Sequence, residues 1–176
     1  MKNRVKTTGK KILHLSPEKN IYRFIKENNE VIATDIQPAF YKRIEKQIRE
    51  EDATHLSFSD NNFDLVIGNH IMEHIPDDNT AMSEIYRVLK PGGQAILQIP
   101  YSNKIATTIE EPNIKNPIKQ SLLFGQKDHV RIYQLQDYLN RLRQCGFTVS
   151  LIEYKDLSAY YKNAIQINEA FICISK

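Results

Sequence analysis

Short apolar runs alternate along this chain with segments in which apolar residues recur at helical spacing. The apolar runs predict strands at 10–15, 30–35, 63–69, 94–100, 147–154 and 169–175, with a further short strand near 47–50. Helical spacing predicts helices at 16–28, 77–89 and 133–146. Alternation of this kind is typical of a parallel, doubly wound α/β sheet with helices on both faces.

Capping signals indicate where these helices begin and end. Ser16 as a hydroxyl N-cap, Pro17 at the first helical position and Glu18 in the positive first turn predict the start of the first helix. The acids at 77–78 are expected to cap the second helix, which "KPGG" then stops. Gly146 is the expected C-terminal stop of the third helix.

The composition fits one domain that spans 1–176, because 41% hydrophobic content is enough for a single core. The net charge of +3 is slight and forms no dense basic face, so we expect no nucleic-acid partner. Cys145 and Cys173 have no partner spacing, which indicates a reducing, cytoplasmic setting. No apolar run approaches the roughly 18 residues of a membrane span, and no signal-type segment follows the basic start.

Polar residues follow the predicted strands at the positions where parallel sheets of this class bind ligands, the carboxyl ends of the strands. Asp35 ends the second strand, about 20 residues beyond the first strand-turn, where a carboxylate is expected to accept hydrogen bonds from a ribose diol. Asp35 could also be an ordinary solvated loop acid.

His70, Glu73 and His74 spell H-x-x-E-H, which is also the motif of one class of zinc peptidases. A peptidase needs the motif within a sustained helix, plus a further acidic ligand. Here the motif begins at the end of a buried strand, and Pro76 would end any helix two residues after His74. The pattern therefore disfavours a peptidase.

The block "HLSFSDNNFDLVIGNHIMEHIPDDNTAMSEIYRVLKPGGQAILQIP" closely resembles the class I S-adenosylmethionine-dependent methyltransferases. The resemblance is dense over 54–100 and extends loosely to "ATDI" upstream and "DHVRIYQLQDYLNRLRQCGFTV" downstream. It implies S-adenosylmethionine as the cofactor and a Rossmann-like sheet of seven strands. The implied strand order is 3-2-1-4-5-7-6, with strand seven antiparallel.

The first turn departs from this family, which usually has an acid and then Gly-x-Gly after the first strand. Here the residues are His14, Leu15, Ser16, Pro17 and Glu18. Helix N-terminal amides set up by Ser16 and Pro17 could meet the methionine carboxylate, and Glu18 could face the ammonium group. The turn looks like that of a bacterial subset near glycan biosynthesis, which places His14, Ser16 and Glu18 among the cofactor-binding residues. The alternative is a plain helix cap at a decayed site.

Other cofactor contacts are implied by the resemblance. Asp52 and Ala53 match an acid-small pair that reads the adenine edge, and Leu56 would pack on the adenine. Asn69 and His70 would lie beside the methionine moiety and the transferred methyl group. Alternatively, Asp52 is only a strand-end acid, and Asn69 and His70 only satisfy the neighbouring turn.

The resemblance also raises the hypothesis of a metal site, because some quinone-pathway O-methyltransferases bind a divalent ion at positions that match His70, Glu73 and His74. Histidine in place of the first acid would favour zinc over magnesium. A plain turn in which His74 hydrogen-bonds locally explains the same residues, so no metal is assigned from the sequence.

The segment 101–133 is expected to cover the substrate as an irregular loop, because the chain begins almost at the first strand and shows no N-terminal lid. His129 is the candidate general base, with Asp128 orienting it or capping a turn. Arg131 could bind an acidic substrate or pair with a surface acid, and Tyr101 could wall the acceptor pocket.

Three classes of function follow. The first is a methyltransferase that acts at oxygen or nitrogen of a small-molecule or glycan-type acceptor. The second is a non-catalytic methyltransferase-like domain that serves as a binding or regulatory module, suggested by the missing glycines. The third is a nicotinamide-dependent oxidoreductase, which the absence of G-x-G-x-x-G disfavours. The sequence predicts no oligomeric state.

Overall fold

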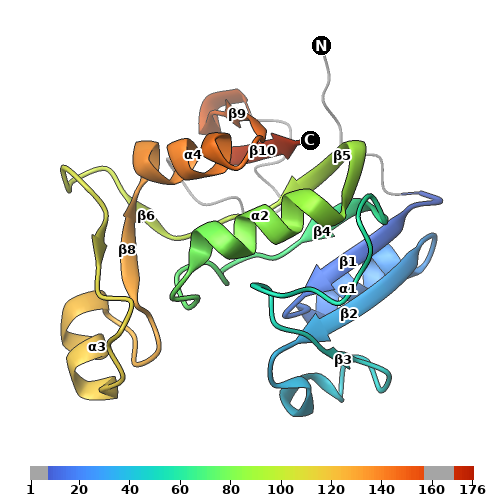
Figure 1. The fold of residues 1–176 in the computed structure, drawn as a ribbon, viewed down its shortest axis with the longest axis horizontal. Coiled ribbons are helices and arrows are strands. Elements are labelled where there is room, and N and C mark those ends of the chain that lie inside the picture. Colours follow the sequence, from blue (N-terminus) through green and yellow to red (C-terminus); the bar gives the residue numbers. More distant parts are fainter. Residues whose placement is uncertain (1–7, 157–168) are drawn as a thin grey trace.

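The computed structural model describes residues 8–156 and 169–176, and its strands build a central sheet with helices on both faces (Figure 1). In chain order the elements are β1 Lys11–Leu15, α1 Lys19–Lys26, β2 Glu30–Asp35, the 3-10 helix η1 Pro38–Tyr41, β3 Arg49–Glu50, β4 Phe63–Ile67, α2 Asp78–Val88, β5 Leu89–Ile96, β6 Tyr101–Ser102, β7 Ile109–Glu110, α3 Pro117–Phe124, β8 Arg131–Gln134, α4 Leu135–Gln144, β9 Thr148–Ile152 and β10 Phe171–Ser175.

The described strands of the central sheet have the order β3-β2-β1-β4-β5-β10-β9. Strands β1 to β5 pair in parallel, whereas β10 is antiparallel to both β5 and β9. The order differs in its numbering from the one the resemblance implied, because β6, β7 and β8 form a second sheet and the closing strands are therefore β9 and β10.

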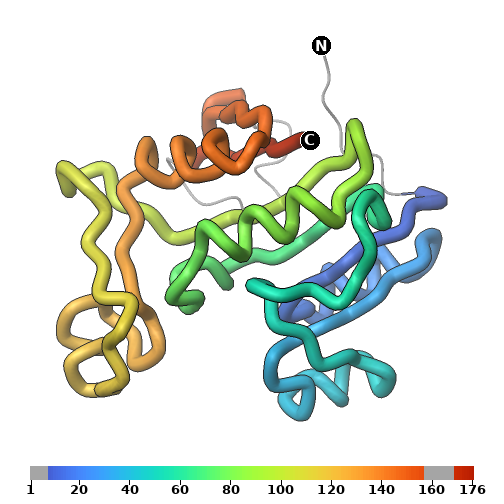
Figure 2. The backbone as a smooth tube through the Cα atoms, viewed as in Figure 1, coloured from blue at the N-terminus to red at the C-terminus, as the bar shows by residue number. Residues whose placement is uncertain are grey.

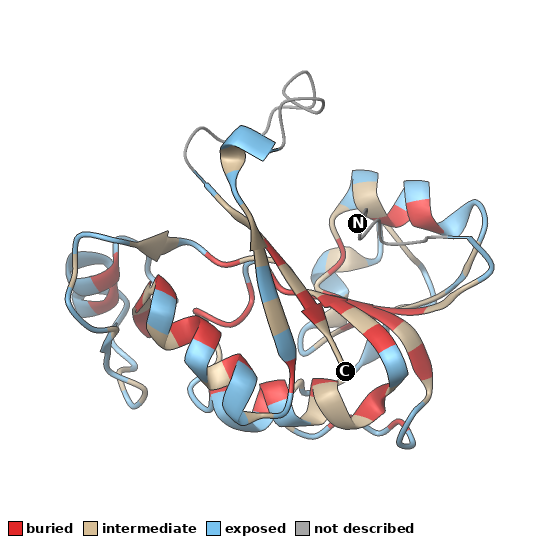
Figure 3. Cartoon of the chain, turned by 90° about the horizontal axis from the view of Figure 1, so that it is seen from above, coloured by how far each residue is buried: buried red, intermediate tan, exposed pale blue. Residues whose placement is uncertain are grey.

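The two faces of the sheet carry separate apolar clusters because successive strand residues point to opposite sides. Leu13 and Leu15 of β1 join the larger cluster, to which α2 and α4 contribute. Ile12 lies on the other face and packs with Ile25 of α1. Figure 3 shows the buried residues concentrated along the strands and on the sides of the helices that face them.

The first helix begins later than its capping signals predicted. Helix α1 starts at Lys19, and its N-cap is Glu18, whose side chain makes no capping hydrogen bond. The prediction of Ser16 as N-cap and Pro17 as the first helical residue is therefore wrong. The Ser16 hydroxyl donates instead to Asp35 Oδ2 at 2.6 Å, and its backbone has the left-handed φ of 48°, so it cannot cap the helix.

Strand β5 also differs from the prediction of 94–100. It begins at Leu89, directly after α2 ends at Val88, and it runs through "KPGG" to Ile96. Phe63 of β4 pairs with Leu89, and the register shifts before Leu65 pairs with Gln94. The glycines therefore lie within an irregular first part of the strand rather than in a loop.

The insert at 101–133 is not the irregular loop that its prolines suggested. Strands β6, β8 and β7 form a small three-stranded sheet, and α3 lies at its far end. Asn116 caps α3 by accepting from the amides of Ile118 and Lys119, and Gly125 ends it with a left-handed φ of 80°. Figure 2 shows the insert leaving the central sheet in yellow and returning in orange beside its outgoing strand.

The described helices are short compared with the roughly 20 residues that span a bilayer. Within 8–156 and 169–176, none combines the length and the apolar content needed to cross a membrane.

Candidate functional site

A cleft of about 740 Å³ lies at the carboxyl ends of β1 and β2 and beside the loops that follow β3 and β4. Cavities of this size suit small ligands and cofactors. Of the residues predicted to bind cofactor, those that line the cleft are Ser16, Asp35, Asp52, Ala53 and His70. The predicted residues absent from its lining are His14, Glu18, Leu56 and Asn69.

Ser16 and Asp35 join the ends of the first two strands. Besides the bond from Ser16, the Asp35 carboxylate accepts from the amide of Gln37 at 2.6 Å through Oδ1. An ionised carboxylate offers about four acceptor positions, of which Ser16 and Gln37 take two and the neighbouring Tyr41 hydroxyl competes for a third. Ser16 occupies the left-handed region that normally favours glycine. The turn thus has a glycine-like shape without a glycine.

Asp52 and Ala53 form the part of the cleft wall that follows β3. Asp52 is exposed, and its Oδ1 accepts from both the amide and the hydroxyl of Thr54, at 2.8 and 2.7 Å. Leu56 is buried in the larger core, and its amide donates to the Glu84 carboxylate at 2.9 Å. Leu56 therefore packs in the core behind this wall and does not line the cleft.

Glu18 lies in a hydrogen-bonded chain with two other predicted residues. Its Oε2 is 2.7 Å from Nε2 of His14, which is fully buried, and its Oε1 accepts from Asn69 Nδ2 at 2.9 Å. Burial opposes ionisation of Glu18, but the bonds from His14 and Asn69 outweigh it and hold the pKa of Glu18 below its ordinary value. These hydrogen bonds join the end of β1 to the end of β4 through the negatively charged Glu18 carboxylate.

His70 lies in the loop after β4 and also has left-handed backbone, with φ of 53°. Its amide donates to the carbonyl of Gln98 at 2.8 Å, which fixes the loop against the end of β5. The Glu73 carboxylate lies 3.7 Å from Nδ1 of His70 and raises the pKa of the imidazole. The exposed ring of His70 lines the cleft, and Glu73 favours its protonated form.

Several apolar or aromatic residues of the cleft were not predicted, and Ile36, Phe40 and Tyr41 are three of them. Ile36 and Phe40 line it although they are 60% and 77% exposed, and Tyr41 lies beside Asp35. Burial, together with the charge of Asp35, raises the pKa of Tyr41. Exposed apolar side chains in a cleft are a mark of ligand contact. Their position just after Asp35 was the sequence signal that could have identified them.

A second cavity, of about 320 Å³, lies under the insert. Three predicted acceptor-side residues line it, namely Tyr101, His129 and Arg131. The Tyr101 hydroxyl accepts from the amide of Ala170 at 3.0 Å, so this ring is anchored to the closing part of the chain.

Arg131 is 1% exposed and is fully occupied by protein partners. Its guanidinium donates to the backbone carbonyls of Met72, Ile75 and Pro76 and to Glu110. These contacts fasten the insert to the loop after β4, so Arg131 holds structure in place and its predicted pairing with a surface acid is met by Glu110.

Asp128 does not orient His129, because it faces His74. Nδ1 of His74 lies 3.3 Å from the Asp128 carbonyl and 3.7 Å from its carboxylate. The rings of His74 and His129 meet edge to face, with centroids 4.6 Å apart. Burial and the neighbouring His74 lower the pKa of His129. Both effects favour the neutral form of His129.

The H-x-x-E-H motif forms turns after β4, with α2 beginning only at Asp78. This agrees with the expectation that no sustained helix carries the motif. Glu73 is buried and His74 faces the cleft, while His129 comes close to both from the insert. The sequence analysis did not predict that His129 would lie beside Glu73 and His74.

Comparison with known proteins places the sequence of 17–97 in a family model described as "Methyltransferase domain". The demethylmenaquinone methyltransferase of Lactiplantibacillus plantarum is 47% identical over 49 residues, which are 28% of this chain and 21% of that protein. The ubiquinone/menaquinone biosynthesis C-methyltransferase of Haemophilus ducreyi is 29% identical over 100 residues, 51% of this chain and 38% of that protein. The chain thus spans less than two fifths of the length of either relative.

Solved structures share the fold. An S-adenosylmethionine-dependent methyltransferase from Mesorhizobium loti superimposes with a TM-score of 0.68 at 16% identity, over 98% of this chain and 92% of that one. A 1,6-didemethyltoxoflavin N1-methyltransferase from Burkholderia thailandensis was solved with S-adenosylhomocysteine bound. It superimposes with a TM-score of 0.60 at 13% identity, over 96% of this chain and 71% of that one. The family model matches the segment that builds most of the cleft, and the solved structures show that the chain has the fold of S-adenosylmethionine-dependent methyltransferases.

Proposed function

We propose that this chain binds S-adenosylmethionine in the cleft and transfers its methyl group to a small-molecule or glycan-type acceptor. The observation that carries the proposal is the Ser16–Asp35 hydrogen bond at the carboxyl ends of β1 and β2. It presents an aspartate with free acceptor capacity at the place where doubly wound sheets bind a ribose.

The residues of the cleft fit the parts of such a cofactor. Asp35 would accept from the ribose hydroxyls, and the Asp52–Ala53 wall would meet the adenine edge. Ile36 and Phe40 offer exposed apolar surface for the adenine face. Glu18 does not line the cleft, but its negative charge, which His14 and Asn69 hold in place, would attract the ammonium group. His70 would lie beside the methionine moiety.

When bound, the cofactor supplies an electrophilic methyl group, so the protein has mainly to position and desolvate the acceptor. The insert supplies the second cavity, with Tyr101 and His129 in its wall. A neutral His129 can accept a proton from an oxygen or nitrogen nucleophile. Arg131 is assigned no substrate contact, because protein carbonyls and Glu110 occupy it.

The relatives named for quinone methylation support a small-molecule acceptor. Neither relative fixes the acceptor or the atom methylated here. A single domain over 1–176, a cytoplasmic location and the absence of a nucleic-acid partner stay predictions from the sequence.

Transfer of a radiolabelled methyl group tests the proposal. The protein is incubated with methyl-labelled S-adenosylmethionine and pools of hydroquinones, phenols, amines and glycans, alongside Asp35→Asn and the exposed control Asp156→Asn. Label should move to at least one pool with wild-type protein and Asp156→Asn, and at least tenfold more slowly with Asp35→Asn. Cofactor binding without transfer to any pool would instead favour the non-catalytic binding module.

A further inference from the structure

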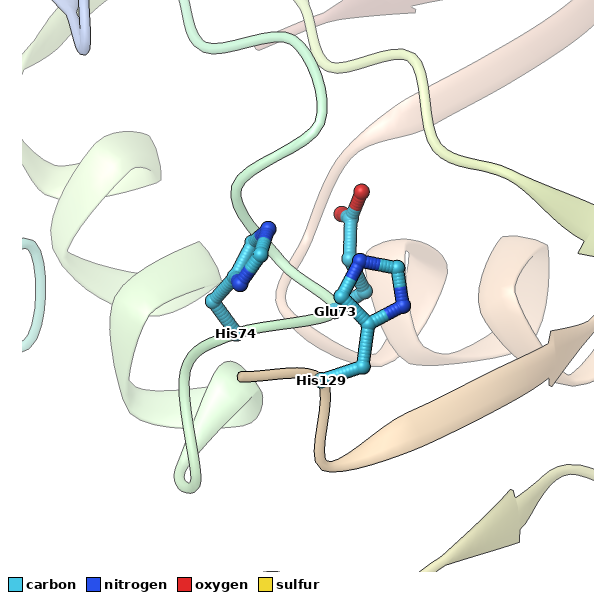
Figure 4. A group of neighbouring side chains, drawn as sticks. All are labelled: Glu73, His74 and His129. Atoms are coloured by element: carbon cyan, nitrogen blue, oxygen red, sulfur yellow. The ribbon is translucent and has the colours of Figure 1, made fainter. Parts of the chain in front are cut away.

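Two histidines and a glutamate from distant parts of the chain converge beside the cleft. Glu73 and His74 come from the loop after β4, and His129 comes from the end of the insert, just before β8 (Figure 4). One ligating atom from each residue lies within 4.8 Å of the other two. Two imidazoles and one carboxylate are a ligand set that suits zinc.

The Glu73 carboxylate lacks the partners that a buried charge requires. Glu73 is 2% exposed, and its Oε2 has no hydrogen-bond partner within the described residues. Its other oxygen lies 3.7 Å from His70. A buried carboxylate oxygen left without a partner is costly, and binding to a cation is one of the ways in which proteins compensate such a charge.

The two imidazoles are arranged as metal ligands usually are. Nδ1 of His74 lies 3.3 Å from the Asp128 carbonyl, a contact that places the ring proton on Nδ1 and leaves Nε2 free to bind an ion. His129 is 5% exposed, its ring meets that of His74 edge to face, and the bond from Gln120 goes to its backbone carbonyl and not to its ring. A neutral imidazole has one ring nitrogen whose lone pair can bind an ion.

The backbone around the cluster is held rigidly. The amide of Val130 donates to the carbonyl of Glu73 at 2.9 Å. This bond joins the loop after β4, which carries Glu73 and His74, to the end of the insert, which carries His129. Arg131 then donates to the carbonyls of Met72 and Pro76 at 2.7 and 2.8 Å. Ligands about 2.1 Å from a tetrahedral zinc lie about 3.4 Å apart, whereas these atoms lie within 4.8 Å of one another, so each pair needs to close by at most about 1.4 Å. His74, at 34% side-chain exposure, has room for this movement.

The cluster also lies between the two cavities. His74 lines the large cleft, and His129 lines the cavity under the insert. We propose that Glu73, His74 and His129 bind one divalent zinc ion, which leaves a coordination position for an oxygen ligand. This set differs from His70, Glu73 and His74, because the buried His129 replaces the exposed His70. It does not depend on the proposed methyl transfer.

The ion and a proton would compete for the same lone pair of His129. A zinc-bound His129 cannot act as the general base, whereas an oxygen bound to zinc loses its proton more easily. The proposal therefore changes the role of His129 from proton acceptor to ligand whenever zinc is present.

Zinc binding is measured directly on chelator-treated protein by isothermal titration calorimetry, with bound metal counted by atomic emission after gel filtration. The variants are Glu73→Gln, His74→Gln and His129→Gln, with the exposed His55→Gln as the matched control. We expect one zinc per chain for wild type and His55→Gln, and at least tenfold weaker binding for each ligand variant. Circular dichroism checks that every variant is folded, and His74, which is partly exposed, provides the variant least able to disturb the core.

Three outcomes would overturn the assignment. The first is a wild-type protein that binds less than half an equivalent of zinc. The second is a set of ligand variants that bind as tightly as wild type. The third is that His70→Gln loses zinc binding while His129→Gln keeps it. This result would assign the ion to His70, Glu73 and His74. The measurement contains no cofactor, so it fails or succeeds independently of methyl transfer.

Discussion

The hydroxyl of Ser16 donates to Asp35 Oδ2 at 2.6 Å and so ties the end of β1 to the end of β2. Ser16 can do so because its backbone turns into the left-handed region, with φ of 48°. A non-glycine residue there carries a conformational cost of about 1 kcal/mol. The structure accepts that cost at the point where the cofactor would bind, and strained backbone of this kind is common at functional sites.

Two substitutions of Ser16 separate its hydroxyl from its backbone. Ser16→Ala and Ser16→Gly both lose the bond to Asp35 and should weaken S-adenosylhomocysteine binding about fivefold, the effect of one hydrogen bond of about 1 kcal/mol. Ser16→Gly should be the more stable of the two by about 1 kcal/mol, because only alanine keeps the left-handed strain. Urea unfolding gives the comparison. Equal stabilities, or a more stable alanine variant, would show that Ser16 is not strained.

Phe40 should contribute to binding and not to folding. Its side chain is 77% exposed and lines the cleft, so Phe40→Ala should change the unfolding free energy by less than about 0.5 kcal/mol. It should weaken S-adenosylhomocysteine binding about tenfold through lost aromatic contact. Phe24→Ala is the control, because Phe24 is 65% exposed on α1 and does not line the cleft. A similar loss of affinity in both variants would contradict the assignment of Phe40.

Arg131→Met tests whether Arg131 is structural. It removes the guanidinium that donates to the carbonyls of Met72, Ile75 and Pro76 and leaves Glu110 with Arg141 as its one arginine donor among the described residues, so the unfolding free energy should fall by about 3 kcal/mol. The exposed control Arg143→Met should stay within about 0.5 kcal/mol of wild type. Unchanged stability with a raised KM for an acidic acceptor would return Arg131 to substrate binding.

Glu110 gives the attachment of the insert a dependence on pH. Hydrogen bonds from Arg141 and Arg131 hold the pKa of Glu110 below its ordinary value of 4.5. A lowered carboxyl pKa contributes stability that is present above about pH 4.5 and is lost as the pH falls through the folded-state value. The contribution should be below about 1 kcal/mol, because solvent partly screens this pair.

Urea unfolding of wild type and Glu110→Gln at several pH values measures that contribution. The difference between the two proteins should be constant from pH 7 to 5 and should shrink between pH 4.5 and 3. A difference that grows as the pH falls has the wrong sign for a lowered pKa and would refute the assignment.

The strands and helices of the central sheet could be predicted because their apolar patterns are long. Asp35 was predicted from its place at the end of a strand, whereas Asp52 was predicted from the family resemblance, and both line the cleft. The start of α1 was wrong because Ser16 has a tertiary partner in Asp35, 19 positions away, that competes for its hydroxyl. Local capping rules do not include such partners.

The insert was mispredicted for two different reasons. Its strands β6 and β7 have two residues each, too few to show any periodicity. Helix α3 did carry signals, with Asn116 before Pro117 and Gly125 at its end, but the surrounding prolines concealed them. The approach of His129 to Glu73 depends on how the insert folds back on the β4 loop, and no local pattern could have indicated it.

Calorimetric titration of the folded protein with S-adenosylmethionine and S-adenosylhomocysteine tests the central claim most directly, and it suits a chain that has no Trp for fluorescence. Wild-type protein should bind one equivalent with micromolar affinity, and Asp35→Asn should bind at least tenfold more weakly while Asp156→Asn matches wild type. Absence of binding by wild-type protein that circular dichroism shows to be folded would contradict the account, as would equal affinity in Asp35→Asn.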